Sequence, residues 1–439
     1  MLAQLTYLVK KSRWISASCR HKFSASVRRI AEPKMDCSNC TTLDPRPCPE
    51  RAAASAGVSL WVPAGLAMGA AAALGFARFA YSLLLPAMRH GLHWSFAQAG
   101  SLGTAMAVGY LLGSLLTVQA ERWLGTARVF VHGLLLTAAS LLAMALFHDY
   151  GALLLLRFIA GFATGCVFIA GFSLAARAGA ASGRSSLFTI IYGSGAGIGM
   201  VLSGLLLPPV LASEWNWAGS WIVLGLLTLF TIALAIPAVK RVPPMAAAAA
   251  DGAGVSLGRL RPILWAYFLY GAGYYALMTF VIAYLHAAGY GQARIVDFWI
   301  VAGLAVSASM ALWGPLLGRL SGSRGVVLTT GVLIASALVL LLQHGVAAVM
   351  LSAALFGGSL MASAFAHLDY ARGLVPSHAW TRIIAAMTVM FSLGQTAGPL
   401  LCGSIADYGG MRIGMFSAIG LLVLCIALAS RQRGSTVSA

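Results

Sequence analysis

Apolar runs of about 20 residues follow one another from Leu60 almost to the end of this chain, and only short polar gaps separate them. Each run can cross about 30 Å of hydrocarbon as an α-helix with a rise of 1.5 Å per residue. Lipid offers no hydrogen-bond partner to a backbone amide, so a run that crosses it must satisfy its own amides as a helix. We predict twelve spans, at 60–88, 97–119, 127–147, 151–177, 185–211, 219–239, 260–286, 295–317, 325–344, 346–370, 383–407 and 411–430.

The composition also excludes a water-facing surface. Only 9% of the residues are charged and 60% are hydrophobic, whereas a soluble domain carries about 25% charged residues. A net charge of +18 would suggest nucleic acid in a soluble protein. Here ten of the 29 Lys and Arg lie in residues 1–51, and most of the others lie between apolar runs. We therefore expect the lipid bilayer, and no nucleic acid, as the partner of this surface.

The cysteines predict neither a metal site nor a disulfide framework. Four of the seven lie in the N-terminal tail, where Cys37 and Cys40 form one C-x-x-C pair. No second pair follows at the spacing of a tetrahedral zinc site, so we expect no metal and no cofactor. The three cysteines inside apolar runs are interpreted as small packing residues.

The polar interruptions divide the chain into five segments. Residues 1–57 are basic and contain no apolar run, which predicts a disordered cytoplasmic tail; a start codon placed too early, with Met35 as the true start, is the alternative. Two bundles of six helices follow at 58–240 and 260–430, joined by a cytoplasmic linker at 241–259 that starts after Lys240. Residues 431–439 form a second cytoplasmic tail.

Basic residues between the spans predict the orientation. With the N-terminus inside, the inner loops hold fourteen Lys and Arg, while the outer loops hold only Arg89, Arg294 and Arg412. Positive charge is enriched on the cytoplasmic side of membrane proteins. We therefore expect a multi-pass protein of the inner membrane with both termini in the cytoplasm.

A glycine pattern recurs six spans apart. Span five and span eleven share the spacing G-x3-G-x4-G, which indicates an internal repeat. Small residues at such spacing let membrane helices approach closely, so we predict a helix-packing role rather than a phosphate-binding loop. The predicted packing residues are Gly195, Gly199, Gly204, Gly394, Gly398, Pro399 and Gly403.

Several predicted spans carry motifs that together resemble those of a known family. Span one carries Gly75-Phe-Ala-Arg78-Phe-Ala-Tyr81 followed by Leu85-Pro86, and span eleven carries Gly394-Gln395-Thr-Ala-Gly398-Pro399. The other matching segments are Arg157-Phe-Ile-Ala-Gly161, Tyr270-Gly-Ala-Gly-Tyr274, Ala371-Arg372-Gly-Leu-Val-Pro376 and Met387-Thr388. In these motifs the chain resembles the major facilitator superfamily, and more narrowly its YbfB-type branch. The resemblance covers residues 60–430 and implies a secondary transporter made of two pseudo-symmetric six-helix bundles.

The chain departs from the superfamily in its cytoplasmic loop motif, G-x-x-x-D-R-x-G-R. The second copy reads Gly314-Pro-Leu-Leu-Gly318-Arg319, with Gly in place of the usual Asp. The first copy keeps little beyond Glu121-Arg122 and Arg128. The resemblance implies a place at the cytoplasmic gate for Arg319.

Two arginines inside spans are the main candidates for a site. Arg78 lies about 27 Å along span one, and an arginine at such depth normally faces a bundle interior or a cavity. The alternative is a side chain that reaches the outer head groups. Arg157 lies near the outer end of span four, either as an interfacial anchor paired with Asp149 or in the coupling or gating role that the resemblance implies.

Aromatic and polar residues of other spans complete the predicted substrate site. We expect Tyr81, Tyr270, Tyr274, Tyr275, Thr388 and Gln395 to line a cavity with apolar walls and few polar groups, although packing alone would also explain them. Asp369 and Arg372, at the inner end of span ten, have the i,i+3 spacing of an ion pair, which predicts a cytoplasmic latch.

These features predict alternating-access transport of a small organic solute. Two deep cations with no deep acid favour an anion such as a carboxylate, and we expect a monomer with this small-molecule substrate as its ligand. Proton-driven efflux of amphipathic or aromatic compounds is one alternative, and a transport-dead membrane sensor is another. The chain lacks H-E-x-x-H, G-x-S-x-G and paired intramembrane carboxylates, so we expect no enzymatic activity.

Overall fold

The structure is a computed structural model that describes residues 58–243, 257–343, 345–376 and 379–432, and within these ranges it contains helices and no strands. Twelve of the described helical segments are long and apolar enough to cross a membrane. They confirm the predicted all-α membrane fold. The predicted tail 1–57, the linker residues 244–256 and residues 433–439 lie outside the described ranges.

The first span is built from three helical elements and each later span from one long helix. In the first six spans these elements are α3 (Trp61–Ala70), the π-helix η1 (Ala71–Phe79), α4 (Tyr81–Gly91), α5 (Phe96–Leu124), α6 (Thr126–Met144), α7 (Tyr150–Ala181), α8 (Ser185–Leu211) and α9 (Asn216–Val239). After the short η2 (Leu257–Leu260), the last six spans are α10 (Arg261–Ala287), α11 (Gln292–Leu317), α12 (Arg324–Leu342), α13 (Val346–Gly373), α14 (Trp380–Gly409) and α15 (Met411–Arg431).

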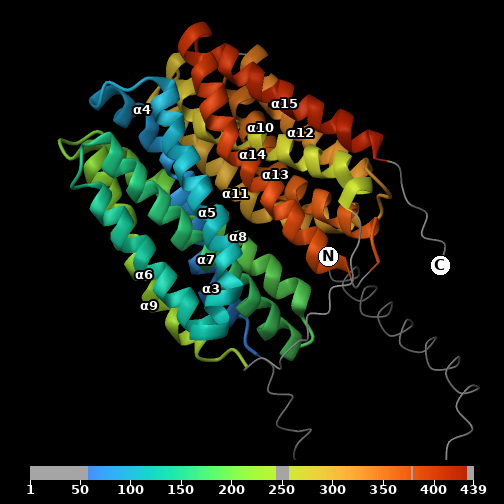
Figure 1. Cartoon of the computed structure of the whole chain (residues 1–439). Coiled ribbons are helices and arrows are strands. Elements are labelled where there is room, and N and C mark those ends of the chain that lie inside the picture. The colour runs from blue at the N-terminus through green and yellow to red at the C-terminus, as the bar shows by residue number, and fades with distance from the viewer. Residues whose placement is uncertain (1–57, 244–256, 344, 377–378, 433–439) are drawn as a thin grey trace, which may run out of the picture. The chain divides into compact units, whose positions relative to one another are not determined.

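The described residues all belong to one compact unit, in which the helices pack as two groups. α3 to α9 pack on one another, as do α10 to α15; they are the blue-to-green and yellow-to-red groups of Figure 1. The two groups, which we call the N-half and the C-half, meet along two seams, α5 against α14 and α8 against α11. The first seam joins spans two and eleven, and the second joins spans eight and five. Each span of one seam is six spans away from a span of the other, as an internal repeat requires.

The first two glycines of each repeat pack α8 and α14 tightly inside their own halves. A Cβ added at Gly195 would collide with the carbonyl oxygen of Ala67, and one at Gly199 would lie 2.6 Å from that of Ala71. The same contacts recur in the C-half, where Gly394 and Gly398 face the carbonyls of Phe268 and Ala272. Span five therefore packs on span one as span eleven packs on span seven, backbone to backbone.

The third glycine of each repeat lies at a seam. A Cβ at Gly204 would be 2.9 Å from the Trp299 ring of α11, and one at Gly403 would be 2.6 Å from the Phe96 carbonyl oxygen of α5. Next to it, the Pro399 carbonyl faces Gly100 of α5. In both α8 and α14, the first two glycines of the motif thus contact a helix of the same half, and the third contacts a helix of the other half.

The start of α5 is held by both halves. At the start of α5, the Ser95 hydroxyl oxygen accepts a hydrogen bond from the Gln98 backbone amide at 3.1 Å. The Gln98 side-chain oxygen in turn accepts from the Ser95 backbone amide at 2.9 Å. The next two amides, of Phe96 and Ala97, donate to the two carboxylate oxygens of Asp407 on α14, at 2.7 and 2.9 Å. A carboxylate from the C-half therefore caps a helix of the N-half, where the helix dipole favours negative charge.

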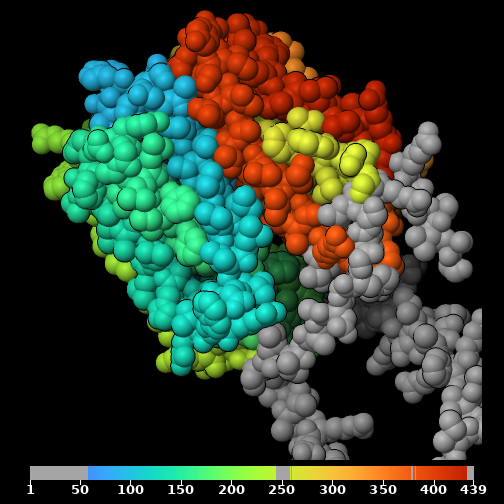
Figure 2. Space-filling model, viewed as in Figure 1, coloured from blue at the N-terminus to red at the C-terminus, as the bar shows by residue number. Residues whose placement is uncertain are grey.

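This cap lies at the end of the bundle predicted to face outward, and that end of the seam is closed. The halves also meet where α4 lies against α10, and there Ser82 donates to the Met278 carbonyl. In Figure 2 the atoms of the two halves touch along the upper part of the α5–α14 seam, and a hollow opens lower in the same seam. Deeper cross-seam bonds run from Thr104 to Thr396 at 2.7 Å and from Ser307 to Ser194 at 3.1 Å.

The glycine contacts predict a strong effect of added bulk on stability. We expect Gly394→Ala to cost about 1–3 kcal/mol, because its Cβ meets rigid backbone that no rotamer change can move. The measurement is the apparent Tm of the purified protein in detergent. Gly420→Ala on α15, where nothing lies within 4 Å of the new Cβ, is the matched control and should leave Tm unchanged or slightly raised. Equal Tm values for the two variants would contradict the packing role.

Candidate functional site

Two buried cations stand out in the interior. Of the Lys, Arg, Asp and Glu side chains that the structure describes, two are buried: Arg78, which is 4% exposed, and Arg157, which is 0% exposed. In these same ranges the structure holds one ion pair, between exposed Arg294 and Asp297, so no described carboxylate lies within 4.0 Å of either guanidinium. The interior therefore holds two positive charges without a described counter-charge.

Arg78 lies where the two halves meet. Its guanidinium carbon is 4.8 Å from the ring centre of Tyr110 on α5 and 4.5 Å from that of Tyr275 on α10. The aromatic faces of both halves thus hold the cation through cation–π contacts. The Nε and Nη2 atoms of Arg78 are buried without a hydrogen-bond partner in the described structure.

A π-helix carries Arg78 into this position. η1 runs over nine residues and ends with a bond of 2.9 Å from the Ala80 amide to the Gly75 carbonyl, five residues back. Such wide turns are rare in proteins and are often found at functional sites. Sequence patterns did not predict this element, because hydrophobic periodicity does not separate a π-helix from an α-helix in an apolar span.

Arg157 joins α7 to that π-helix. Its Nη1 donates to the Ala77 carbonyl at 2.6 Å, and its guanidinium lies over the rings of Tyr81 and Trp221, at 4.7 and 5.7 Å. Its Nε and Nη2 are buried without a partner among the described residues. Arg157 also lies close enough to Arg78 for the two charges to repel.

The alternative of an interfacial anchor paired with Asp149 is not what the structure shows. The Asp149 carboxylate accepts from the Ala152 amide at 2.8 Å and caps the start of α7. A carboxylate at an N-cap satisfies a free amide and lies in a favourable helix dipole, so this geometry competes with the predicted pair. Arg157 instead turns inward and is fully buried.

Two neutral polar side chains of α14 face the same region from the C-half. Gln395 is fully buried, and both its carboxamide oxygen and its nitrogen lack a hydrogen-bond partner in the described structure. The Ser392 hydroxyl, three residues earlier and on the same helix face, is likewise buried and unpartnered. The Tyr274 hydroxyl lies beside Gln395 and also near Arg78, which links these groups.

These residues lie near the middle of their spans. Tyr110 is fourteen residues from each end of α5, and Tyr274 is thirteen from each end of α10. Gln395 is fifteen and fourteen residues from the ends of α14. At 1.5 Å per residue all three are about 20 Å from both ends of their helices, near the middle of the membrane-spanning bundle.

The structure thus brings six of the predicted residues together into one cluster. We call it the arginine cluster, and it consists of Arg78, Tyr81, Tyr110, Arg157, Trp221, Tyr274, Tyr275, Ser392 and Gln395. Tyr110, Trp221 and Ser392 were not predicted. A tryptophan near the start of a span is usually an interface residue, and a lone tyrosine or serine in an apolar helix carries no signal of its own.

Other predicted substrate residues have their polar atoms engaged elsewhere. Tyr81 donates to the Ala99 carbonyl at 2.7 Å, so its ring forms a wall of the cluster while its hydroxyl is occupied. Tyr270 donates to the Leu360 carbonyl at 2.6 Å and stacks on His367 at 4.9 Å. Thr388 bonds back to the Ile384 carbonyl of its own helix at 2.8 Å. Whether they contact a substrate stays a prediction.

The predicted gating residues lie at the ends of the bundle. Asp369 and Arg372 are both exposed, and the described ranges hold no ion pair between them, so the latch stays a prediction. Arg372 lies over the Trp380 ring at 5.9 Å instead, and exposed pairs gain little because water competes for both partners. Arg319 is exposed just after α11. A gating role for these residues stays a prediction.

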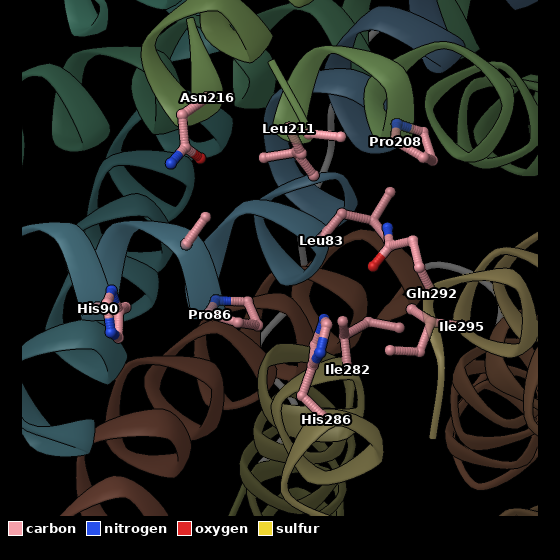
Figure 3. Close-up of a pocket in the computed structure, with 12 residues that line it drawn as sticks. Leu83, Pro86, His90, Pro208, Leu211, Asn216, Ile282, His286, Gln292 and Ile295 are labelled. Carbon is pink, nitrogen blue, oxygen red and sulfur yellow. The ribbon is translucent and has the colours of Figure 1, made fainter. Parts of the chain in front are cut away.

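A separate pocket of about 440 Å³ lies between the predicted outer ends of α4, α8, α10 and α11. Leu83, Pro86, Leu211 and Ile282 are among its apolar walls, and Figure 3 shows them around the opening. Its polar residues are His90, Asn216, His286 and Gln292. The pocket begins at Leu83, five residues beyond Arg78, and does not include the arginine cluster.

Comparisons with known proteins agree on the class. The fold matches the nucleoside transporter NupG with a TM-score of 0.65 at 14% identity, over 84% of this chain and 98% of that one. It also matches a bacterial homologue of the human lysosomal transporter Spinster in an inward-facing and occupied conformation. That match has a TM-score of 0.65 at 14% identity and covers 85% of this chain and 97% of the other. A human organic anion transporter, TETRAN, matches with a TM-score of 0.58 at 17% identity, over 84% and 99%. These likenesses show that the chain shares the fold of these transporters.

The family follows from the sequence comparison. The model of the family described as "Uncharacterised MFS-type transporter YbfB" matches residues 70–430, and the chain belongs to this family of multi-pass membrane transporters. A protein of Haemophilus influenzae, whose name proposes metabolite transport, is 32% identical over 149 residues. That match spans 34% of this chain and 36% of the relative, about a third of each protein.

The engaged hydroxyl of Tyr270 predicts a stability effect. Tyr270→Phe removes a buried bond to the Leu360 carbonyl, and we expect it to cost about 1 kcal/mol, seen as a lower apparent Tm in detergent. The control is Tyr408→Phe, at a side chain that is 95% exposed, which should leave Tm unchanged. A Tyr270→Phe variant as stable as the wild type would show that this bond contributes nothing.

Proposed function

We propose that this protein transports a small organic anion by alternating access, with the arginine cluster as its binding site. The observation that carries the proposal is the pair of buried guanidiniums that no described carboxylate neutralises. A buried charge without a counter-charge costs several kcal/mol. An anion bound between Arg78 and Arg157 offsets that cost, and its oxygens accept from the unpartnered nitrogens.

The position of the cluster supports transport between the halves. Arg78 belongs to the N-half and contacts Tyr275 of the C-half, so both halves would hold a ligand there. The relative from Haemophilus influenzae is named for metabolite transport and TETRAN for organic anions. These names agree with the proposal, although the match to TETRAN concerns the fold alone.

The α5–α14 seam supports a state in which its predicted outer end is closed. Asp407 joins α14 to α5 there, and Figure 2 shows the hollow at the opposite end of the seam. Alternating access then requires the Asp407 bonds to break when the outer end opens. The matched structure of the Spinster homologue is also inward-facing.

Loss of Arg78 should abolish anion transport. The experiment begins with a thermal-shift screen of the purified protein against carboxylates, their neutral amides and the matching amines, because a bound ligand raises Tm by mass action. Flux of the best carboxylate into liposomes should fall at least tenfold in Arg78→Ala. Arg294→Ala removes a cation that forms an exposed pair and should transport normally. Transport by Arg78→Ala as fast as by the wild type would reject the proposed site.

This screen also separates the alternatives. Efflux of amphipathic compounds predicts that amines and neutral amides stabilise the protein as well as carboxylates do. A sensor without transport predicts ligand-induced stabilisation with no flux into liposomes. Either result would replace the proposed function.

The Asp407 cap predicts a shift between conformations. Asp407→Asn keeps the shape of the side chain but removes the negative charge that faces the α5 amides. The interaction of such a charge with an exposed helix end stabilises the closed state by about 1 kcal/mol. We expect the outward-open population to rise about fivefold. Spin labels at Ser213 and Tyr408, both exposed at the predicted outer end, should report it as a larger fraction of long distances.

Asp297→Asn is the matched control for this shift. Asp297 lies near the same end of the C-half, but its partner is Arg294 of the same helix. Its distance distribution should equal that of the wild type. An unchanged distribution in Asp407→Asn would show that the cap does not hold the outer end closed.

A further inference from the structure

The two halves contribute different chemistry to the arginine cluster. The N-half supplies both buried cations, Arg78 and Arg157, together with the Trp221 indole N–H, which is buried and unpartnered among the described residues. The described part of the C-half has no buried Lys, Arg, Asp or Glu. It supplies the tyrosine rings of α10 and the neutral groups of Ser392 and Gln395.

The buried carboxamide of Gln395 lowers the stability of the fold, because its polar atoms lack partners among the described residues. A carboxamide offers two donor hydrogens and an oxygen with two acceptor sites, and neither end has a partner in the described structure. Each buried polar group left without a partner costs about 1–3 kcal/mol. A helix packed for stability alone would hold an apolar residue of this size at position 395.

The Gln395 carboxamide adjoins the arginine cluster through Tyr274. Residue 394 is packed against the Phe268 carbonyl and residue 398 against that of Ala272, so this face of α14 is sealed by α10. Tyr274 of the same helix lies beside the Gln395 carboxamide and near Arg78. The open hydrogen-bonding capacity of Gln395 therefore adjoins the position that the proposed function gives to an anion.

We infer that Gln395 selects, among small anions, those that also carry a neutral donor–acceptor pair such as an amide or a lactam, with the anionic group held by the N-half and the neutral pair by the C-half. The inference rests on the proposed function for the anionic end of the ligand. The Gln395 carboxamide can donate to the carbonyl oxygen of an amide or accept from its N–H, and with a lactam, whose N–H and C=O lie on the same side, it can do both. A site built for such bonds rejects the analogue that lacks them, because its own polar groups are then left unpaired.

This division would also couple binding to conformational change. A ligand held at one end by Arg78 and at the other by Gln395 makes its full set of bonds only when the two halves are close together around it. An anion without the neutral pair leaves the C-half contacts unmade. It should therefore bind more weakly and be transported more slowly.

Matched probes test the inference. Hippurate carries a benzamide group and a carboxylate, 4-phenylbutyrate has the same length and charge without the amide, and N-ethylbenzamide has the amide without the charge. Binding to the purified full-length protein is measured by thermal shift and by isothermal titration. We expect the wild type to bind hippurate about fivefold more tightly than 4-phenylbutyrate, because the trans amide of hippurate can make one net hydrogen bond with the Gln395 carboxamide, and to bind N-ethylbenzamide more weakly than either.

Two variants separate the inference from the proposed function. Gln395→Met keeps the size and removes both polar ends, so it should bind hippurate and 4-phenylbutyrate equally, at the wild-type affinity for 4-phenylbutyrate. Its apparent Tm without ligand should equal or exceed that of the wild type, because two unpartnered buried atoms are gone. Arg78→Ala should lose both anions and leave the weak binding of N-ethylbenzamide unchanged.

The outcomes are distinguishable. If both anions bind through Arg78 and Gln395→Met weakens them equally or not at all, the role of Gln395 is wrong and the proposed function stands. If neither anion binds the wild type more tightly than N-ethylbenzamide does, the proposed function fails, and the inference fails with it. A lower Tm of Gln395→Met without ligand would assign the side chain to packing and reject the selective role.

Discussion

Burial of positive charge without a described counter-charge is the constraint on which the rest of this structure depends. A bundle surrounded by lipid gains nothing from placing a guanidinium in its middle, and the cost is several kcal/mol for each ion. The protein reduces that cost with aromatic faces and one backbone carbonyl: Tyr110 and Tyr275 around Arg78, and Ala77 at Arg157. These contacts leave four guanidinium nitrogens unpartnered, which an anionic ligand would complete.

The repeat in the chain explains the scaffold but not its chemistry. The glycines of α8 and α14 make equivalent contacts in the two halves and bring both helices to the seams. The residues that these equivalent helices support are different, since the cations lie in one half and the neutral polar groups in the other. A symmetric frame with an asymmetric interior suits a ligand whose two ends differ.

The outer seam shows how a single side chain can belong to both halves. Ser95 and Gln98 cap α5 from within, and the remaining two amides depend on Asp407 of α14. Because these bonds are made at an exposed end, they are strong enough to bias an equilibrium between conformations and weak enough to break during transport.

The sequence by itself determined the number of spans, their helical nature and the family, because lipid leaves apolar segments of this length a single regular structure. It also pointed to Arg78, Tyr274, Tyr275 and Gln395, since polar groups are rare and costly at such depth. Tertiary structure alone decided which of these groups share a site. The inward turn of Arg157 to the Ala77 carbonyl and the bond from the Tyr270 hydroxyl to the Leu360 carbonyl both depend on partners from distant helices. No local pattern contains such contacts, because helix packing brings together residues that are far apart in the chain.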